Sequence, residues 1–187
     1  AETDWAGRFR EKKFAYAFGA ALALTCAAGF SHSSNYRDAL GFWTRAAADS
    51  PNSAMSHIGL ATALAQYGRF PEAEAELRRA VELDPSDYGA RYNLGVALAA
   101  QGRAYDALAQ YSAALALKPD LAEAHLAAGL ILAAQGLPED ARASFTEALR
   151  LSPNFPDAHY LLGFLLASHG LAAEAAVHYR TAIRLRP

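Results

Sequence analysis

The sequence predicts an all-α fold, a right-handed α-solenoid of helix–turn–helix repeats, and three observations support it. Proline recurs every 34 residues, glycine and two columns of alanine share that period, and no insertion interrupts it. The columns are Pro51, Pro85, Pro119, Pro153 and Pro187; Gly68, Gly102, Gly136 and Gly170; Ala73, Ala107, Ala141 and Ala175; and Ala80, Ala114, Ala148 and Ala182. A fixed period of this length is typical of stacked helical repeats.

Each block is predicted to contain two helices joined by a tight turn. In the block at 88–121, Leu94, Gly95 and Leu98 share one face of a first helix. Gly102 ends that helix, because a left-handed residue at this point carries no penalty in glycine. Pro119 ends the second helix. The predicted organisation is a half repeat at 34–53 and four repeats at 54–87, 88–121, 122–155 and 156–187.

Small residues on the first helices alternate in space with large residues on the second helices. Two helices can approach closely only where a side chain is nearly absent, so we expect the small column to receive the large one. The small column is Ala61, Gly95, Gly129 and Gly163, and the large column is Leu77, Tyr111, Phe145 and Tyr179.

Composition excludes several classes of protein. The formal net charge of −2 argues against a nucleic-acid-binding protein, which would need a basic face. Cys26 is the only cysteine, so disulfides within the chain and cysteine-rich metal sites are excluded. Hydrophobic residues make up 53% of the sequence and charged residues only 19%, as expected for helices that are buried on several sides.

The N-terminal stretch combines a polar, basic flank at 1–13 with an apolar segment at 14–33. The charge-free run from Phe14 to Phe30 has three interpretations: a membrane-spanning helix, a helix that caps the solenoid, or a signal peptide. A span would place the repeats on the periplasmic or luminal side, because the basic flank stays in the cytoplasm. Otherwise the protein is cytoplasmic and soluble. The chain starts at Ala1 and ends on a repeat-closing proline, so we expect further sequence beyond both ends.

The half repeat is in register with the array. Ala39, Trp43, Ala46 and Pro51 occupy the columns of a second helix. Its first helix would have to come from the end of the apolar segment, residues 20–33.

These columns resemble the tetratricopeptide repeat, a 34-residue helix–turn–helix unit. Asn93-Leu94-Gly95 and Pro119 match its pattern directly, and the resemblance covers about residues 36–187. The chain departs from the family at the first bulky position, often tryptophan, which holds His57, Arg91, His125 and His159.

A second, shorter resemblance concerns the junction with the apolar segment. Tyr36-Arg37-Asp38 and Trp43, after an apolar helix and before the repeats, look like the C-terminal region of membrane O-mannosyltransferase-type proteins. This implies an accessory region that recruits protein acceptors to a glycosyltransferase. None of that family's acidic catalytic loops is present in the sequence, so no activity is implied.

The resemblance implies that the first helices line a concave groove. The predicted groove residues are Ile58, Thr62, Tyr92, Asn93, Val96, Leu126, Leu130, Tyr160 and Phe164, over a floor of Ala65, Ala99, Ala133 and Ala167. An apolar, aromatic groove suits an amphipathic helix or an extended apolar peptide. The alternative occupants are a missing C-terminal helix of the chain and a second copy. Family members that clamp a peptide carboxylate use lysine, arginine and asparagine, and this chain offers only Asn93.

Catalytic and metal-binding patterns are absent from the sequence. His57, His125 and His159 share a column and are separated by whole repeats, so they cannot converge on one ion, and we expect ordinary packing histidines. His169 and His178 lie nine residues apart on different helices, at most as an incidental pair. We therefore expect no enzyme, no cofactor and no metal. The predicted function is a membrane-tethered scaffold for protein partners, with the glycosyltransferase accessory region and a self-assembling subunit as alternatives.

Overall fold

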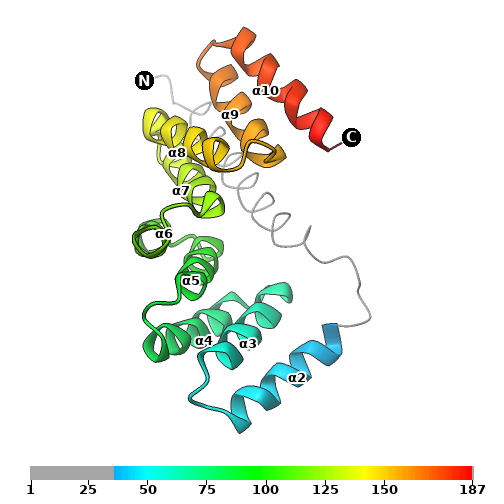
Figure 1. Cartoon of the computed structure of the whole chain (residues 1–187), viewed down its shortest axis with the longest axis vertical. Helices are drawn as coiled ribbons and strands as arrows, with labels where there is room; N and C mark the ends of the chain where they lie inside the picture. Colours follow the sequence, from blue (N-terminus) through cyan, green and yellow to red (C-terminus); the bar gives the residue numbers. More distant parts are fainter. Residues whose placement is uncertain (1–35, 187) are drawn as a thin grey trace, which may run out of the picture. The chain divides into compact units, whose positions relative to one another are not determined.

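The computed structural model describes residues 36–186 and is helical throughout that range (Figure 1). The predicted all-α fold is therefore confirmed for the described part of the chain. The helices are α2 (Tyr36–Asp49), α3 (Ala54–Gln66), α4 (Phe70–Leu83), α5 (Tyr88–Ala100), α6 (Ala104–Leu117), α7 (Ala122–Ala134), α8 (Pro138–Leu151), α9 (Pro156–Ser168) and α10 (Ala172–Leu185).

The chain forms two compact units, one ending at Leu117 and the other beginning at Lys118. In the first unit each helix from α2 to α6 packs against the next, and α3 also contacts α5. In the second unit α7 to α10 pack in the same way, and α7 also contacts α9. First helices of neighbouring repeats are therefore adjacent within each unit.

The glycine column ends every first helix. Gly68, Gly102, Gly136 and Gly170 have φ between 71° and 80°, in the left-handed region. The residue after each glycine donates its backbone N–H to a carbonyl five residues earlier; Arg103 N lies 3.0 Å from Leu98 O. Gly102 N also donates to Ala99 O at 2.9 Å. Together these bonds form a Schellman motif, which satisfies carbonyls that a helix end leaves without a partner.

The small and large columns pack as the sequence predicts. A Cβ added to Gly95 would lie 2.5 Å from Cε1 of Tyr111, and one added to Gly129 would lie 2.7 Å from Cε1 of Phe145. In the last repeat the corresponding distance from Gly163 to Tyr179 is longer, 3.1 Å. Each large ring therefore occupies the space that the missing side chain leaves.

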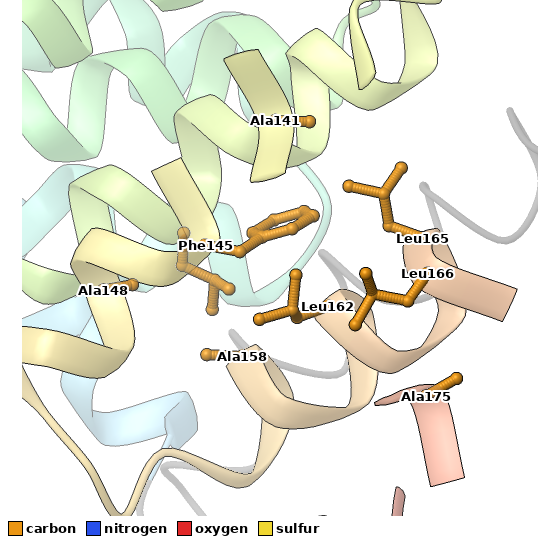
Figure 2. Close-up of a cluster of buried hydrophobic side chains, with 9 residues drawn as sticks. Ala141, Phe145, Ala148, Ala158, Leu162, Leu165, Leu166 and Ala175 are labelled. Atoms are coloured by element: carbon orange, nitrogen blue, oxygen red, sulfur yellow. The ribbon is translucent and has the colours of Figure 1, made fainter. Parts of the chain in front are cut away.

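The core of the second unit lies between α8 and α9, with contributions from α7 and α10. Figure 2 shows the ring of Phe145 on α8 lying beside Leu162 and Leu165 of α9. Leu126 belongs to this cluster and is only 5% exposed. The predicted assignment of Leu126 to an accessible groove therefore conflicts with its burial.

The predicted apolar helix at 14–33 lies outside the described residues, as does the first helix of the half repeat. None of the helices between residues 36 and 186 has the length and apolar character needed to cross a bilayer.

Candidate protein-interaction site

The predicted binding residues of the first unit lie on α3 and α5. Ile58, Tyr92, Asn93 and Val96 are half-buried, and Thr62 is exposed. The Thr62 hydroxyl donates to the Ile58 carbonyl of its own helix at 2.8 Å. The Tyr92 ring packs against Tyr111 with centroids 5.8 Å apart, which fixes its orientation. This face is apolar and half-buried.

The predicted binding residues of the second unit divide into two groups. Tyr160 and Phe164 lie one helical turn apart on α9 and are 55% and 41% exposed. Leu130 is half-buried on α7, whereas Leu126 is in the core. The structure thus presents two adjacent aromatic side chains on one helix, and we name Tyr160 and Phe164 the α9 aromatic pair.

The Tyr160 ring is positioned by a second tyrosine from the neighbouring helix. Tyr179 of α10 lies with its ring centroid 5.7 Å from that of Tyr160, at an interplanar angle of 51°. Burial raises the pKa of the Tyr179 hydroxyl, and the nearby Tyr160 raises it further. The Tyr179 hydroxyl therefore stays neutral and adds no charge to the surface.

The histidine column has a structural role that links neighbouring repeats. The Nε2 atoms of His57, His125 and His159 donate to the carbonyls of the preceding column prolines at 3.0, 3.1 and 3.0 Å. Arg91 replaces the histidine in its repeat and donates Nε and Nη2 to Pro85 O at 3.1 and 2.9 Å. The acceptors are Pro51, Pro119 and Pro153 for the three histidines. The column that departs from the family pattern thus ties each first helix to the end of the preceding repeat.

In His57 and His159 the other ring nitrogen also has a side-chain partner, which the sequence did not lead us to expect. His57 Nδ1 lies 2.6 Å from Glu76 Oε2, and His159 Nδ1 lies 3.0 Å from His178 Nδ1. His178 therefore pairs with His159. The sequence had suggested His169 as its only candidate partner, in an incidental pair. The signal was present, because both partners stand 19 residues after their histidine and so form one column.

A polar network joins α4 to the following repeat in the first unit. Glu74 is buried and accepts hydrogen bonds from Arg78, Gln101 and Arg103 at 2.8, 2.8 and 2.7 Å. Burial alone would raise the pKa of Glu74, but the hydrogen bonds from Arg78, Gln101 and Arg103 outweigh it and lower the pKa. The carboxylate therefore stays ionised, and the network is a structural tie with no group poised to transfer a proton.

A cavity of about 370 Å³ lies between α8, α9 and α10 in the second unit. Leu149, Leu162 and Leu166 contribute apolar lining, and the polar lining residues are Arg142, Thr146, Arg150, His159, Glu174 and His178. Over residues 36–186, no group of three or more histidine, cysteine, aspartate or glutamate side chains could hold a metal ion.

The tetratricopeptide repeat model matches the sequence in four overlapping segments, 32–88, 59–122, 92–156 and 126–187. A comparison with curated proteins gives no match. A comparison with solved structures gives many matches.

Three of these structures illustrate the similarity. MamA from Desulfovibrio magneticus RS-1 is 22% identical with a TM-score of 0.72, over 92% of this chain and 94% of that one. PilF of Pseudomonas aeruginosa is 23% identical with a TM-score of 0.76, over 95% and 78%. YrrB, described as a TPR protein with an unusual peptide-binding site, is 23% identical with a TM-score of 0.65, over 82% and 79%. These likenesses show a shared fold, and the family model matches most of the length of the chain, so the chain belongs to the tetratricopeptide repeat family.

Proposed function

We propose that the chain is a non-catalytic scaffold that binds an apolar peptide or helix of a partner protein through its first helices. The observation that carries this proposal is the α9 aromatic pair, Tyr160 and Phe164, exposed one turn apart. Large aromatic residues dominate binding energy at protein interfaces when a partner covers them. Family membership supports an interaction role, and YrrB provides a peptide-binding relative of the same fold.

The face in the first unit extends the proposal to α3 and α5. Ile58, Tyr92 and Val96 offer half-buried apolar surface, and Asn93 adds one amide that can hydrogen-bond a peptide backbone. A face of this composition favours an amphipathic helix with apolar residues at i, i+3, i+4 and i+7, or an extended apolar strand.

The test is a peptide-binding measurement on the full chain. Peptides are selected from a displayed library, and their affinity is then measured by fluorescence anisotropy for the wild type and for Tyr160→Ala with Phe164→Ala. We expect the double variant to weaken binding at least about thirtyfold, since even one hot-spot truncation costs about 2 kcal/mol and about 1.4 kcal/mol is a tenfold change.

A matched control uses an exposed aromatic and an exposed aliphatic residue on α6. Tyr105 and Leu117 are 81% and 45% exposed, so Tyr105→Ala with Leu117→Ala removes similar apolar area from a second helix. This control should bind like the wild type. Equal affinity of the wild type and the α9 variant for every selected peptide would refute the assignment.

Self-association is a second candidate, supported by the exposed surface of α10. Ile183 and Val177 are 67% and 54% exposed, whereas Val81, Leu115 and Leu149, which share the column of Ile183, are half-buried. A second copy packing on α10 would cover this surface. Sedimentation velocity of the wild type and Ile183→Glu tests it: the variant should be monomeric at concentrations where the wild type associates.

Two finer features stay predictions from the sequence. Membrane attachment through residues 14–30 predicts that the full chain resists alkaline carbonate extraction from the membranes of its host, whereas a deletion of 14–30 releases it. The alternative role, a C-terminal accessory region of a membrane glycosyltransferase that recruits protein acceptors, rests on Tyr36-Arg37-Asp38 and Trp43 alone. It predicts that the membrane spans and acidic loop of such an enzyme belong to the same polypeptide.

A further inference from the structure

The last repeat contains a histidine pair, His159 on α9 and His178 on α10, which the proposed function does not use. His159 Nε2 lies 3.0 Å from the Pro153 carbonyl oxygen. A carbonyl oxygen only accepts, so this nitrogen must carry the hydrogen. In the neutral ring, His159 Nδ1 is then an acceptor with a lone pair.

That lone pair faces His178. The two Nδ1 atoms are 3.0 Å apart and the ring centroids 5.3 Å apart. This centroid distance is close to the contact distance plus two ring radii, so the nitrogens point at one another. The arrangement is that of a hydrogen bond with one proton between two nitrogens, with His178 Nδ1–H as donor. It does not suit a shared metal ion, because both lone pairs would have to turn toward a common point beside the line that joins them.

The number of protons decides whether this contact survives. A first added proton goes to His178 Nε2 and leaves the Nδ1–H···Nδ1 bond intact. A second proton can go only to His159 Nδ1, because His159 Nε2 already carries one. Two N–H groups then face each other at hydrogen-bond distance and both rings are positively charged, which replaces attraction by repulsion.

The first repeat provides a natural comparison at the same two columns. His57 Nε2 faces the Pro51 carbonyl at 3.0 Å, and His57 Nδ1 faces the Glu76 carboxylate at 2.6 Å. Both nitrogens therefore meet acceptors, and a fully protonated ring keeps both bonds. In the last repeat His178 stands where the first repeat has Glu76. Full protonation therefore keeps the contact in the first repeat and breaks it in the last repeat.

Burial and the neighbouring His159 favour the neutral form of His178. Arg142 and Arg150 of α8 line the same cavity, and Glu174 of α10 is the acidic residue that lines it with them. Glu174 lies 3.8 Å from Arg142, which offsets part of its charge. Burial lowers the pKa of His178, His159 lowers it further, and Glu174 opposes the shift. Since the folded pKa lies below the ordinary value of about 6.5, this group contributes stability above about pH 6.5 that is lost as the pH falls through the folded value.

The histidine pair is adjacent to the proposed binding residue Tyr160 on α9 and to Tyr179 on α10, which packs against it. Tyr160 follows His159, Tyr179 follows His178, and the two tyrosine rings also pack together. We propose that double protonation of the His159–His178 pair separates α9 from α10 and thereby removes the support that Tyr179 gives to Tyr160 of the α9 aromatic pair. The regulatory part of this inference rests on the proposed function; the separation of the helices does not.

The test compares amide hydrogen exchange of the full chain at about pH 7.5 and about pH 5.5, corrected for intrinsic exchange, on either side of the ordinary histidine pKa. In the wild type, α9 and α10 should lose protection severalfold on acidification relative to α5 and α6. In His178→Asn the loss should disappear, because the amide can turn either its oxygen or its nitrogen toward His159. His125→Asn, in a repeat whose histidine has no histidine partner, should respond like the wild type.

A second variant controls for the lower helix propensity of asparagine, which could itself destabilise α10. His178→Glu recreates the arrangement of the first repeat and should keep α9 and α10 protected at the lower pH. Equal protection of the wild type at the two pH values, or the same loss in both His178 variants, would overturn the inference.

Peptide binding then separates the two proposals. Affinity for a peptide selected at about pH 7.5 should fall severalfold at about pH 5.5 in the wild type and not in His178→Glu. A wild-type affinity that does not change with pH, together with a real loss on Tyr160→Ala, overturns the regulation and leaves the binding function standing. An exchange response without any effect of Tyr160→Ala on binding rejects the binding function and leaves the proton-dependent separation standing.

Discussion

The contact between Gly95 and Tyr111 gives the sharpest test of how the repeats pack. In Gly95→Ala, the new methyl group would lie 2.5 and 2.7 Å from two atoms of the Tyr111 ring, against a normal carbon–carbon contact of about 3.5–4.0 Å. The ring is fully buried, so it cannot swing into solvent. Alanine in place of glycine within a helix stabilises the fold by about 1 kcal/mol through its higher helix propensity. Overpacking of a core destabilises the fold by about 1–3 kcal/mol. Because the overlap is deep, we expect a net loss of about 2 kcal/mol.

The assay measures the free energy of unfolding of the full chain in urea, with far-UV circular dichroism as the signal. Gly163→Ala is the matched control: its nearest ring atom is 3.1 Å away and Tyr179 is only half-buried, so propensity and overlap should nearly cancel. Gly95→Ala with Tyr111→Leu recreates the Ala61 and Leu77 combination of the first repeat and should recover most of the loss. If Gly95→Ala is as stable as the wild type, the close approach of these helices is not what the glycine column provides.

Three further predictions concern the turns, the network and the first helix pair. Gly102→Ala should cost about 1–2 kcal/mol, because φ is 77° there; thermal unfolding measures it, and an unchanged midpoint would count against the turn assignment. Glu74→Gln should cost about 1–3 kcal/mol at neutral pH. The Glu74 pKa is lowered in the fold, so its contribution is present above about pH 4.5 and lost as the pH falls through the folded value; the variant and the wild type should therefore converge in acid, and a constant difference would contradict this. Gly59→Ala should drive α2 from α3, because the new methyl would overlap the Trp43 ring. With Trp5→Phe in the background, Trp43 is the only tryptophan, and its fluorescence emission should shift to longer wavelength in Gly59→Ala. An unshifted emission spectrum would show that the contact between Gly59 and Trp43 is dispensable.

Periodicity predicted the helical part of this protein well, because its signals are local. Gly102 ends a helix through its own φ, and Tyr111 packs on Gly95 of the same repeat. Chemistry that connects two columns was harder to predict. The pairing of His159 with His178 depends on side chains from two helices, and the partner at this column changes from Glu76 in the first repeat.

The exposure of the predicted groove residues was predictable only in part. Tyr160 and Phe164 are exposed on α9, but Leu126 on α7 is buried in the core. The sequence of α7 is apolar on nearly every side, so no stripe distinguishes an inner from an outer face. Packing against α8 and α9 decides which of its leucines is covered, and that information lies outside the helix itself.

The bond between each first helix and the preceding proline carbonyl has a consequence for how such an array changes length. Donor and acceptor are six residues apart and stand on opposite sides of a repeat boundary, as in His125 and Pro119. Duplication or loss of one whole unit regenerates the same donor beside the same acceptor, wherever the breakpoint falls. An insertion of any other length between the two would separate them. The array can therefore gain or lose complete repeats without losing this hydrogen bond. A change by any part of a repeat between donor and acceptor would break it.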